Sequence, residues 1–311
     1  MDYELPGKRI WVAGHRGMVG GSVVRRLELE DCEIIKAGRD ELDLLDQTAV
    51  HHWMAESCPD YVVVAAAKVG GIHANNTAPV DFLENNLVIQ NNIFSAAHVC
   101  NVERLLFLGS SCIYPKFAEQ PICEESLLTG VLEPTNEWYA IAKIAGIKLV
   151  QAYRKQYGRD WISAMPTNLY GPGDNYNLET SHVLPALLRK FHEAKVSGAS
   201  KVVLWGSGKT FREFLHCDDL ADALIFLLKN YSSDEHINVG SGSEVSILEL
   251  AEIISRVVGY KAELVFDTSK PDGTPRKLLD TSRLNNLGWS NARALEEGIQ
   301  STYQDWLSLQ V

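Results

Sequence analysis

Short apolar runs alternate with helical patterns through the first half of this 311-residue chain. This alternation limits the possible folds more than any other feature. We predict strands at residues 9–13, 32–37, 61–67, 104–109 and 161–165. Strands that alternate with helices are typical of an α/β fold with a doubly wound parallel sheet. Ligands of such a sheet bind in the crevice beyond the carboxyl ends of its strands.

A glycine-rich turn joins the first predicted strand to a helix that we expect at residues 22–30. Free backbone amides and the positive end of the helix dipole would face a pyrophosphate at this turn. The spacing is G-x-x-G-x-x-G, which differs from the commoner G-x-G-x-x-G. We therefore predict a dinucleotide site made by Gly14, His15, Arg16, Gly17, Met18, Val19 and Gly20.

The end of the second predicted strand bears on the choice of cofactor. An NAD enzyme commonly has a carboxylate about 20 residues after the glycines, where it binds the ribose 2′-hydroxyl. Arg39 occupies that region here, and Arg16 lies inside the glycine turn. Two guanidinium groups suit a 2′-phosphate, so we predict NADP(H). Asp40 follows Arg39 directly, and both arginines could instead be ordinary surface residues.

Tyr139 and Lys143 lie four residues apart in a helix that we expect to reach about residue 157. That spacing places both side chains on one face of the helix. We expect the lysine ammonium to lower the tyrosine pKa from about 10, so that the phenol gives a proton to a carbonyl oxygen. The same spacing occurs by chance on many helices, so the pair alone is weak evidence.

Ser110 and Cys112 follow the fourth predicted strand and should therefore face the crevice. A serine hydroxyl there can stabilise a developing alkoxide, although a capping serine is the commoner role. Cys112 is either a small buried hydrophobic residue or a base, and a base requires a thiolate with a lowered pKa.

In the second half, His182 precedes a helix predicted at residues 183–195. It is either a helix-terminus residue or a general acid near neutral pH. Lys190, Trp205, Arg212 and Lys277 supply cations and an aromatic plate that could bind a nucleotide diphosphate and stack its base. Scattered along the chain, they are equally consistent with surface residues and a core tryptophan. Residues 270–277 form a basic, turn-rich loop.

The chain is long for a single hydrophobic core. Regular alternation weakens beyond about residue 172, where a proline and glycines mark the exit from the nucleotide-binding unit. We predict a cofactor domain at residues 1–172 that carries the Ser/Tyr/Lys site. Residues 173–311 are expected to form a smaller α/β substrate domain, with some segments returning to the first sheet.

The formal net charge of −11 argues against nucleic acid or an acidic membrane as a partner. No apolar run approaches the roughly 20 residues that a membrane helix needs. The acidic N-terminus lacks a signal-peptide core. The six cysteines form no Cys-x-x-Cys pair, a usage typical of a reducing cytosol. We therefore expect a cytoplasmic protein, and nothing in the sequence indicates a metal site.

Several motifs together resemble the GDP-L-fucose synthase family, within the extended short-chain dehydrogenase/reductase superfamily. Ser110 and Tyr139-x-x-x-Lys143 carry the resemblance to the superfamily. The closer resemblance rests on residues 13–20, 65–72, 108–115 and 270–277. The resemblance extends over nearly the whole chain, and it implies a Rossmann fold and a homodimer formed through helices of the first domain.

The resemblance implies a two-stage, NADPH-dependent reaction on GDP-4-keto-6-deoxy-D-mannose. In that family, the residue matching Cys112 is the base and the residue matching His182 is the acid in the inversion of C3 and C5. The residues matching Ser110, Tyr139 and Lys143 then support hydride transfer to the C4 ketone.

Further contacts are also implied by the resemblance alone. Family cofactor contacts correspond to residues 14–20 and to Arg39, Asp40, Glu41, Leu42, Asp43, Leu44, Leu108, Gly109, Ser110, Ser111, Lys143, Pro166, Thr167, Asn168, Leu169 and His182. Family substrate contacts correspond to Lys190, Trp205, Arg212, Asp272 and Lys277. Lys190 departs from the arginine that is common in the family, so it keeps the charge but loses the bidentate fork.

Two alternatives remain at this point. A GDP-L-colitose synthase, or a heptose-directed relative, would use the same residues. A non-catalytic NADPH-binding protein on the same fold is also possible in principle, because a fold does not determine a function.

Overall fold

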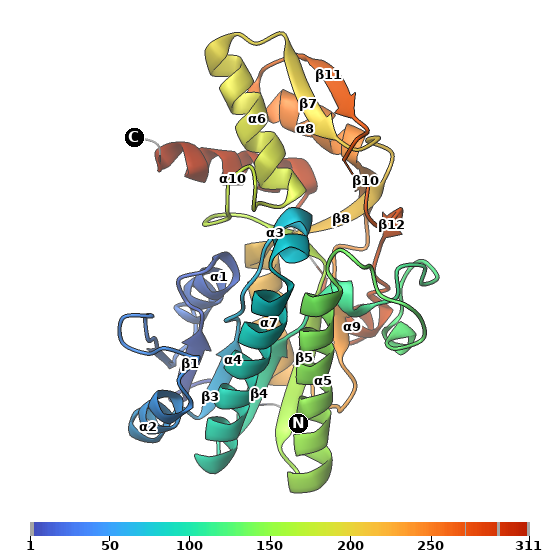
Figure 1. The fold of residues 1–311 in the computed structure, drawn as a ribbon. Coiled ribbons are helices and arrows are strands. Elements are labelled where there is room, and N and C mark those ends of the chain that lie inside the picture. Colours follow the sequence, from blue (N-terminus) through green and yellow to red (C-terminus); the bar gives the residue numbers. More distant parts are fainter. Residues whose placement is uncertain (1–2, 271, 291–292, 310–311) are drawn as a thin grey trace.

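A computed structural model describes residues 3–270, 272–290 and 293–309. Its larger part contains a six-stranded sheet in the order β2-β1-β3-β4-β5-β9 (Figure 1). Every neighbouring pair in this sheet is parallel. The strands are β1 (Arg9–Ala13), β2 (Glu33–Ile35), β3 (Tyr61–Val64), β4 (Arg104–Leu108), β5 (Asp160–Pro166) and β9 (Ile237–Val239). The predicted doubly wound parallel α/β fold is confirmed.

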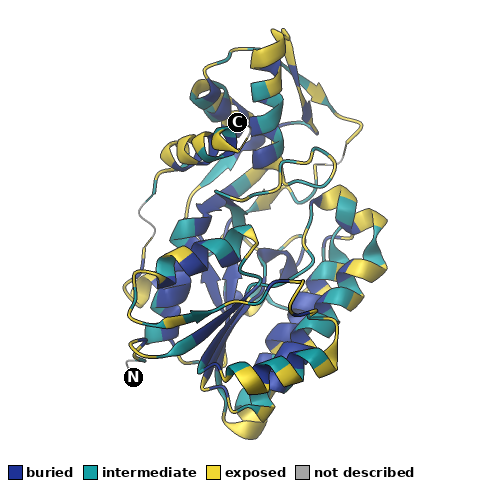
Figure 2. Cartoon of the chain, turned by 90° about the vertical axis from the view of Figure 1, so that its left-hand side faces the viewer, coloured by how far each residue is buried: buried dark blue, intermediate teal, exposed yellow. Residues whose placement is uncertain are grey.

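Helices cover both faces of this sheet. One face packs against α1 (Met18–Leu27), α7 (Cys217–Asn230) and α9 (Ser282–Asn286). The other face packs against α2 (Gln47–Ser57), α4 (Pro79–Val99) and α5 (Glu137–Tyr157). The strands are buried while the outer sides of the helices are exposed (Figure 2). Burial on both faces explains why these strands are apolar throughout instead of alternating.

A smaller part lies beyond the carboxyl ends of the parallel strands (Figure 1). Its core is formed mainly by α6 (Val183–Ser197), α8 (Ile247–Val258) and α10 (Leu295–Ser308). In its sheets, β8 pairs with β6, β10 and β12, and β7 pairs with β11. These strands are β6 (Asn168–Tyr170), β7 (Lys201–Trp205), β8 (Phe211–His216), β10 (Glu244–Ser246), β11 (Glu263–Asp267) and β12 (Arg276–Lys277). The short helix α3 (Ile72–Thr77) lies between the two parts in Figure 1.

The chain passes between the two parts more than once. After β8 it returns to the large sheet, where α7 packs on α1 and β9 pairs with β5. It then goes back to build β10, α8, β11 and β12. Both parts are therefore completed by segments that lie beyond residue 172.

The first helix begins at Met18, so the predicted start at residue 22 is wrong. Gly20 lies in its first turn, and a Cβ there would be 2.1 Å from the carbonyl oxygen of Gly14. Glycine is needed because the helix packs directly on the turn that precedes it. The same turn contains Gly14, whose φ of +88° is unfavourable for other residues.

Three further elements differ from the prediction. Strand β2 is shorter than residues 32–37 because only part of that apolar run pairs with β1. Strand β3 ends at Val64 and not at residue 67. Helix α2 was not predicted, since Val50 and Met54 are its only buried residues and the rest of its pattern is mixed. None of the helices in the described part of the chain is long and apolar enough to cross a membrane.

Candidate active site

A cavity of about 420 Å³ opens between the carboxyl ends of the parallel strands and the smaller part. The loops that follow β3, β4 and β5 form one side, and residues of α6, β7, β8 and β12 form the other. This is the position expected for a ligand on a doubly wound sheet.

Most of the predicted site residues line this cavity. They are Met18, Val19, Leu108, Gly109, Ser110, Ser111, Cys112, Tyr139, Lys143, Pro166, Thr167, Asn168, Leu169, His182, Lys190, Trp205, Arg212, Asp272 and Lys277. The remaining residues of the glycine turn, and residues 39–44, do not line it. Those residues lie around the ends of β1 and β2, where the outer part of a dinucleotide would extend.

The glycine turn has the geometry of a phosphate site. A Cβ on Gly14 would lie 2.7 Å from the amide nitrogen of Ala66, so the turn approaches the loop after β3 closely. The cap of α1 is Gly17, which offers no side chain to its first-turn amides. Met18 and Val19 in that turn line the cavity. The Nδ1 atom of His15 is buried without a hydrogen-bond partner in the described part of the chain. These features fit a dinucleotide pyrophosphate.

The arginine pair lies at the outer end of this region. An exposed ion pair joins Arg16 Nη1 to Asp40 Oδ1 at 2.8 Å. Arg39 is exposed beside it. Glu41 accepts a hydrogen bond from the amide of Gly38, which orders the turn. The Leu42 side chain is buried in the core, so only its backbone is available to a ligand.

Lys143 and Tyr139 meet near the end of β4. Lys143 Nζ donates a hydrogen bond to the carbonyl oxygen of Leu108 at 2.7 Å and lies 5.7 Å from the centre of the Tyr139 ring. Burial lowers the pKa of Lys143 to about 8. Burial also raises the pKa of Tyr139, and the neighbouring Cys112 thiolate adds to this rise. The expectation that Lys143 lowers the pKa of Tyr139 is therefore wrong, because burial of the phenol outweighs the charge.

Ser110 and Cys112 occupy the loop at the end of β4. Ser110 caps the short 3-10 helix η1 (Ser111–Ile113), and its Oγ accepts from the amide of Cys112 at 3.4 Å. The capping role is therefore real, while the residue also lines the cavity. Burial raises the pKa of the Cys112 thiol, so the lowered pKa that a resting thiolate base would need is not found. Lys277, then Ser110 and Lys143, act in the opposite direction.

His182 is the cap residue of α6, but its side chain makes no capping hydrogen bond. The residue is exposed toward the cavity. The protein around the ring removes part of its hydration, and this desolvation lowers the pKa of His182. The positive charge of Lys277 lowers it further. The preceding residues are held by α3, because Gly71 N donates to the carbonyl oxygen of Thr180 at 2.9 Å.

The far end of the cavity is cationic and aromatic. Trp205 is half-exposed, and the ammonium groups of Lys190 and Lys270 each lie 5.2 Å from the centre of its ring. Arg212 Nη2 donates to the carbonyl oxygen of Asp272 at 3.1 Å. The Asp272 carboxylate in turn accepts from the amide of Ser207. Of the predicted loop at residues 270–277, Pro271 lies outside the described residues.

Comparison with known proteins gives the family. The sequence matches the NAD dependent epimerase/dehydratase family over residues 10–240. The chain belongs to that family. A GDP-L-fucose synthase of Sinorhizobium fredii is 60% identical over 306 residues, which cover 98% of each chain.

Two solved structures are also similar in fold. A GDP-6-OMe-4-keto-L-xylo-heptose reductase from C. jejuni has a TM-score of 0.94 at 35% identity, over 100% of both chains. A GDP-L-fucose synthetase from Naegleria fowleri bound to NADP has a TM-score of 0.91 at 31% identity, over 99% of this chain and 97% of the other. Like the Sinorhizobium fredii relative, both of these proteins are named for reactions of GDP-sugars.

The sequence reasoning missed part of the site of this epimerase/dehydratase chain. The loop after β3 and α3 contributes Val69, Gly70, Gly71, Ile72, His73 and Asn75 to the cavity. Its glycines were noted in a motif but given no role. The loop before α5 adds Glu133, Thr135 and Asn136. The Oδ1 atom of Asn136 is buried without a hydrogen-bond partner in the described chain. Because Asn136 directly precedes the helix that carries Tyr139, its position in the sequence could have indicated that it lies at the site.

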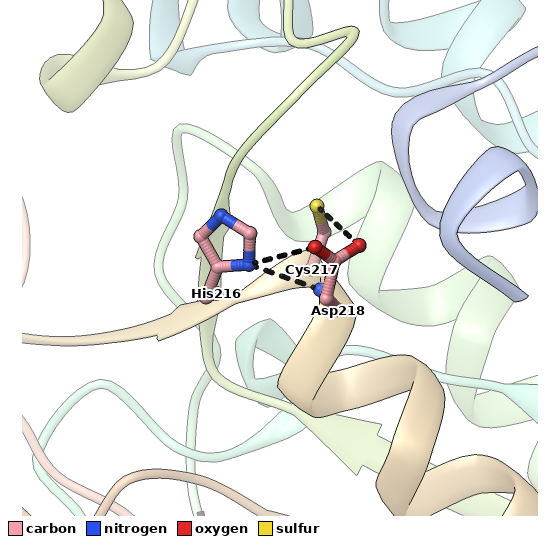
Figure 3. A group of neighbouring side chains, drawn as sticks. All are labelled: His216, Cys217 and Asp218. Carbon is pink, nitrogen blue, oxygen red and sulfur yellow. Dashed lines mark hydrogen bonds and ion pairs between the residues drawn. The ribbon is translucent and has the colours of Figure 1, made fainter. Parts of the chain in front are cut away.

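A second polar cluster lies at the start of α7, outside the cavity. His216, Cys217 and Asp218 bring potential metal ligands within 4.8 Å of one another (Figure 3). His216 Nδ1 lies 2.6 Å from Arg293 Nη1, and Arg25 pairs with Asp218 at 2.6 Å. The guanidinium groups of Arg25 and Arg293 therefore supply the positive charge beside Asp218 that a bound metal ion would otherwise supply. The cluster is an ion-pair network that links α7 to α1 and to the segment before α10.

Proposed function

We propose that this chain converts GDP-4-keto-6-deoxy-D-mannose to GDP-L-fucose with NADPH, by epimerisation at C3 and C5 followed by reduction of the C4 ketone. The observation that carries the proposal is the convergence of Ser110, Cys112, Tyr139, Lys143 and His182 on one cavity. The 60% identity to a GDP-L-fucose synthase over nearly the whole chain supports the choice of sugar.

One set of donors serves both stages. Epimerisation and reduction each build negative charge on the oxygen at C4, first as an enolate and then as an alkoxide. The hydroxyls of Ser110 and Tyr139 line the cavity from β4 and α5 and would donate to that oxygen. Donors that are already in place stabilise such charge without reorganising.

The epimerisation needs a base and an acid on opposite faces of the sugar. The Cys112 sulfur would remove the proton from C3 or C5, which the neighbouring ketone acidifies. His182 reaches the cavity from α6, in the smaller part, and would return a proton to the other face. Inversion requires that the two groups flank the bound sugar, and they reach the cavity from different elements, η1 and the start of α6.

The reduction uses the helix α5 pair. NADPH supplies the hydride to C4 when it is bound. Tyr139 would donate its phenolic proton to the C4 oxygen. Burial raises the pKa of Tyr139, so the phenol still carries the proton that this role requires. Lys143 is anchored to the carbonyl oxygen of Leu108 and supplies positive charge next to the ring. Its pKa of about 8 keeps the ammonium protonated at neutral pH.

The guanosine diphosphate half would bind at the cationic end of the cavity. Trp205 offers a half-exposed ring for stacking, and Arg212 and Lys190 offer positive charge. Lys190 already contacts the ring of Trp205 and donates to the carbonyl oxygen of Val203 at 2.9 Å. A lysine gives one point charge where an arginine gives a fork, so we expect weaker binding of the diphosphate without a change of activity.

We also propose the wider setting of the enzyme. Residues 1–172 would hold most of the cofactor contacts, and residues 173–311 most of the GDP-sugar contacts. A cytoplasmic homodimer is proposed with them. Light scattering coupled to size exclusion, which gives the mass of the particle relative to the 34.5 kDa chain, tests the dimer.

Cofactor choice follows from the exposed arginines. Arg39→Ser is expected to raise the KM for NADPH at least about tenfold, because a charge-assisted contact to the 2′-phosphate is lost. The KM for NADH should change little. Arg9→Ser is a matched control, since Arg9 is an exposed arginine paired with Glu33 at the other end of β1. A parallel loss for both cofactors would instead indicate a general effect on the turn.

The direct test is identification of the product by NMR after incubation with GDP-4-keto-6-deoxy-D-mannose and NADPH. GDP-L-fucose is the expected product. The 3-deoxy sugar and a GDP-4-keto-heptose are offered in parallel, and a higher kcat/KM for either would favour the colitose or heptose alternative. Absence of NADPH oxidation with every GDP-4-keto sugar would favour a non-catalytic protein.

A further inference from the structure

Lys277 is a cation inside the cavity to which the family resemblance assigns a substrate contact but no part in the proton transfers. It lies in β12 and lines the cavity together with Cys112 and Arg212. Within the described chain, no hydrogen bond or ion pair joins its ammonium group to another residue. A cation held in a cavity without a carboxylate partner is costly, so its position calls for a function.

The fold delivers Lys277 to the side of Cys112. Strand β12 runs parallel to β8, with Lys277 opposite Arg212. The next residue, Leu278, donates its amide to Gln120 Oε1 at 2.9 Å and accepts from the amide of Ile122 at 2.8 Å. These bonds join the strand to the loop that follows Cys112. These hydrogen bonds therefore hold β12, which carries Lys277, next to the segment that follows Cys112.

Cys112 and Lys277 share a small recess of the cavity, about 20 Å³ in volume. Its other lining residues are Ser111, Tyr114, Pro115, Ile122, Glu133, Asn136 and Thr274. Trp205, Lys190 and Arg212 do not line it. Lys277 therefore lies where the recess meets the main cavity, next to Arg212 on one side and to Cys112 on the other.

We propose that Lys277 is a positioning residue whose ammonium group stabilises the thiolate form of Cys112 when the thiol loses its proton. Its catalytic meaning rests on the function proposed above, in which Cys112 is the base. The proton leaves carbon for the Cys112 sulfur, the electron pair stays on the sugar as an enolate, and Lys277 keeps its own proton throughout.

The charges around Cys112 favour this role. Burial raises the pKa of the Cys112 thiol, and Lys277 is the strongest of the groups that oppose the rise. Ser110 and Lys143 follow, from the end of β4 and from α5. Tyr139 also faces the sulfur, and its own pKa is raised by the Cys112 charge. Burial lowers the pKa of Lys277, and the charge of Arg212 lowers it further. Negative charge on Cys112 opposes this most strongly, followed by Glu133 and Glu213, so the ammonium and the thiolate stabilise each other.

The test measures Cys112 without any substrate. The full-length Lys277→Met variant is labelled with iodoacetamide over a range of pH, and the labelled Cys112 peptide is quantified by mass spectrometry. We expect alkylation at neutral pH to slow at least about tenfold and the pH profile to move upward, because only the thiolate reacts. Lys277→Arg should retain most of the rate, since it keeps the charge.

Arg276→Met is the matched control. Arg276 precedes Lys277 in the same strand, is exposed and pairs with Glu244 instead of facing the cavity. Its labelling profile should equal that of the wild type. If Lys277→Met fails to fold by circular dichroism, Lys277→Gln replaces it in the same comparison.

Two results would overturn the proposal. An unchanged Cys112 profile with a raised KM for the GDP-sugar would make Lys277 a diphosphate ligand. An equal slowing in Arg276→Met would assign the effect to the strand. The labelling measurement itself does not depend on which sugar is the substrate, because it uses none.

Discussion

Replacing Cys112 with serine is expected to abolish solvent deuterium incorporation at C3 and C5 of the GDP-sugar. A serine hydroxyl ionises far less readily than a thiol, and the burial that already raises the pKa of Cys112 would oppose its ionisation further. Loss of a positioned base costs about 10² to 10⁴ in rate. NMR of the sugar after incubation in D₂O, without NADPH, measures this step alone.

The same variant should bind NADPH normally. Cys112 lies at the recess and not at the glycine turn, so a fluorescence titration with NADPH should give the wild-type affinity. Cys123→Ser is the control for a general effect of losing a thiol, since Cys123 is partly buried and lies outside the cavity. Exchange that persisted in Cys112→Ser would remove Cys112 as the base.

Tyr139→Phe should have the opposite pattern. Reduction should fall by about 10² to 10⁴, because the proton donor to the C4 oxygen is lost. Exchange at C3 and C5 should fall much less than reduction, since Cys112 remains as the base and the Ser110 hydroxyl still donates to the C4 oxygen. Single-turnover oxidation of NADPH measures the reduction, and deuterium incorporation measures the exchange in the same preparation.

Tyr153→Phe is a suitable control because Tyr153 lies on the same helix, where it packs against Trp161. It should leave both steps unchanged. If Cys112→Ser and Tyr139→Phe lost exchange equally, separate roles for the base and the proton donor would be contradicted.

The parallel sheet could be predicted because its strands are buried on both faces. The nearly continuous apolar sequence of β4 predicts a buried strand without any tertiary information, and every residue of that strand is buried in the structure. Boundaries were harder to predict. The start of α1 depends on how closely Gly20 approaches Gly14, and α2 buries only two residues. Neither feature follows from local hydrophobicity, because both are set by contacts with distant segments.

The site was predictable as a set of residues but not as an electrostatic environment. The spacing of Tyr139 and Lys143 correctly placed both at the cavity. The predicted direction of the Tyr139 pKa was wrong, and that of Cys112 could not be predicted, because burial depends on the whole fold. The sequence likewise gave no sign that Lys277 lies beside Cys112. That proximity arises from the pairing of β12 with β8 and from the backbone bonds of Leu278.

The return of the chain to the large sheet has a consequence for how this enzyme can diversify. Strand β9 and helix α7 come after β8, and the family match ends at residue 240, directly after β9. A gene segment for residues 1–172 would therefore encode a sheet without its edge strand β9 and with one face covered by α1 alone. The two parts of the fold therefore cannot be exchanged as contiguous gene segments joined at residue 172.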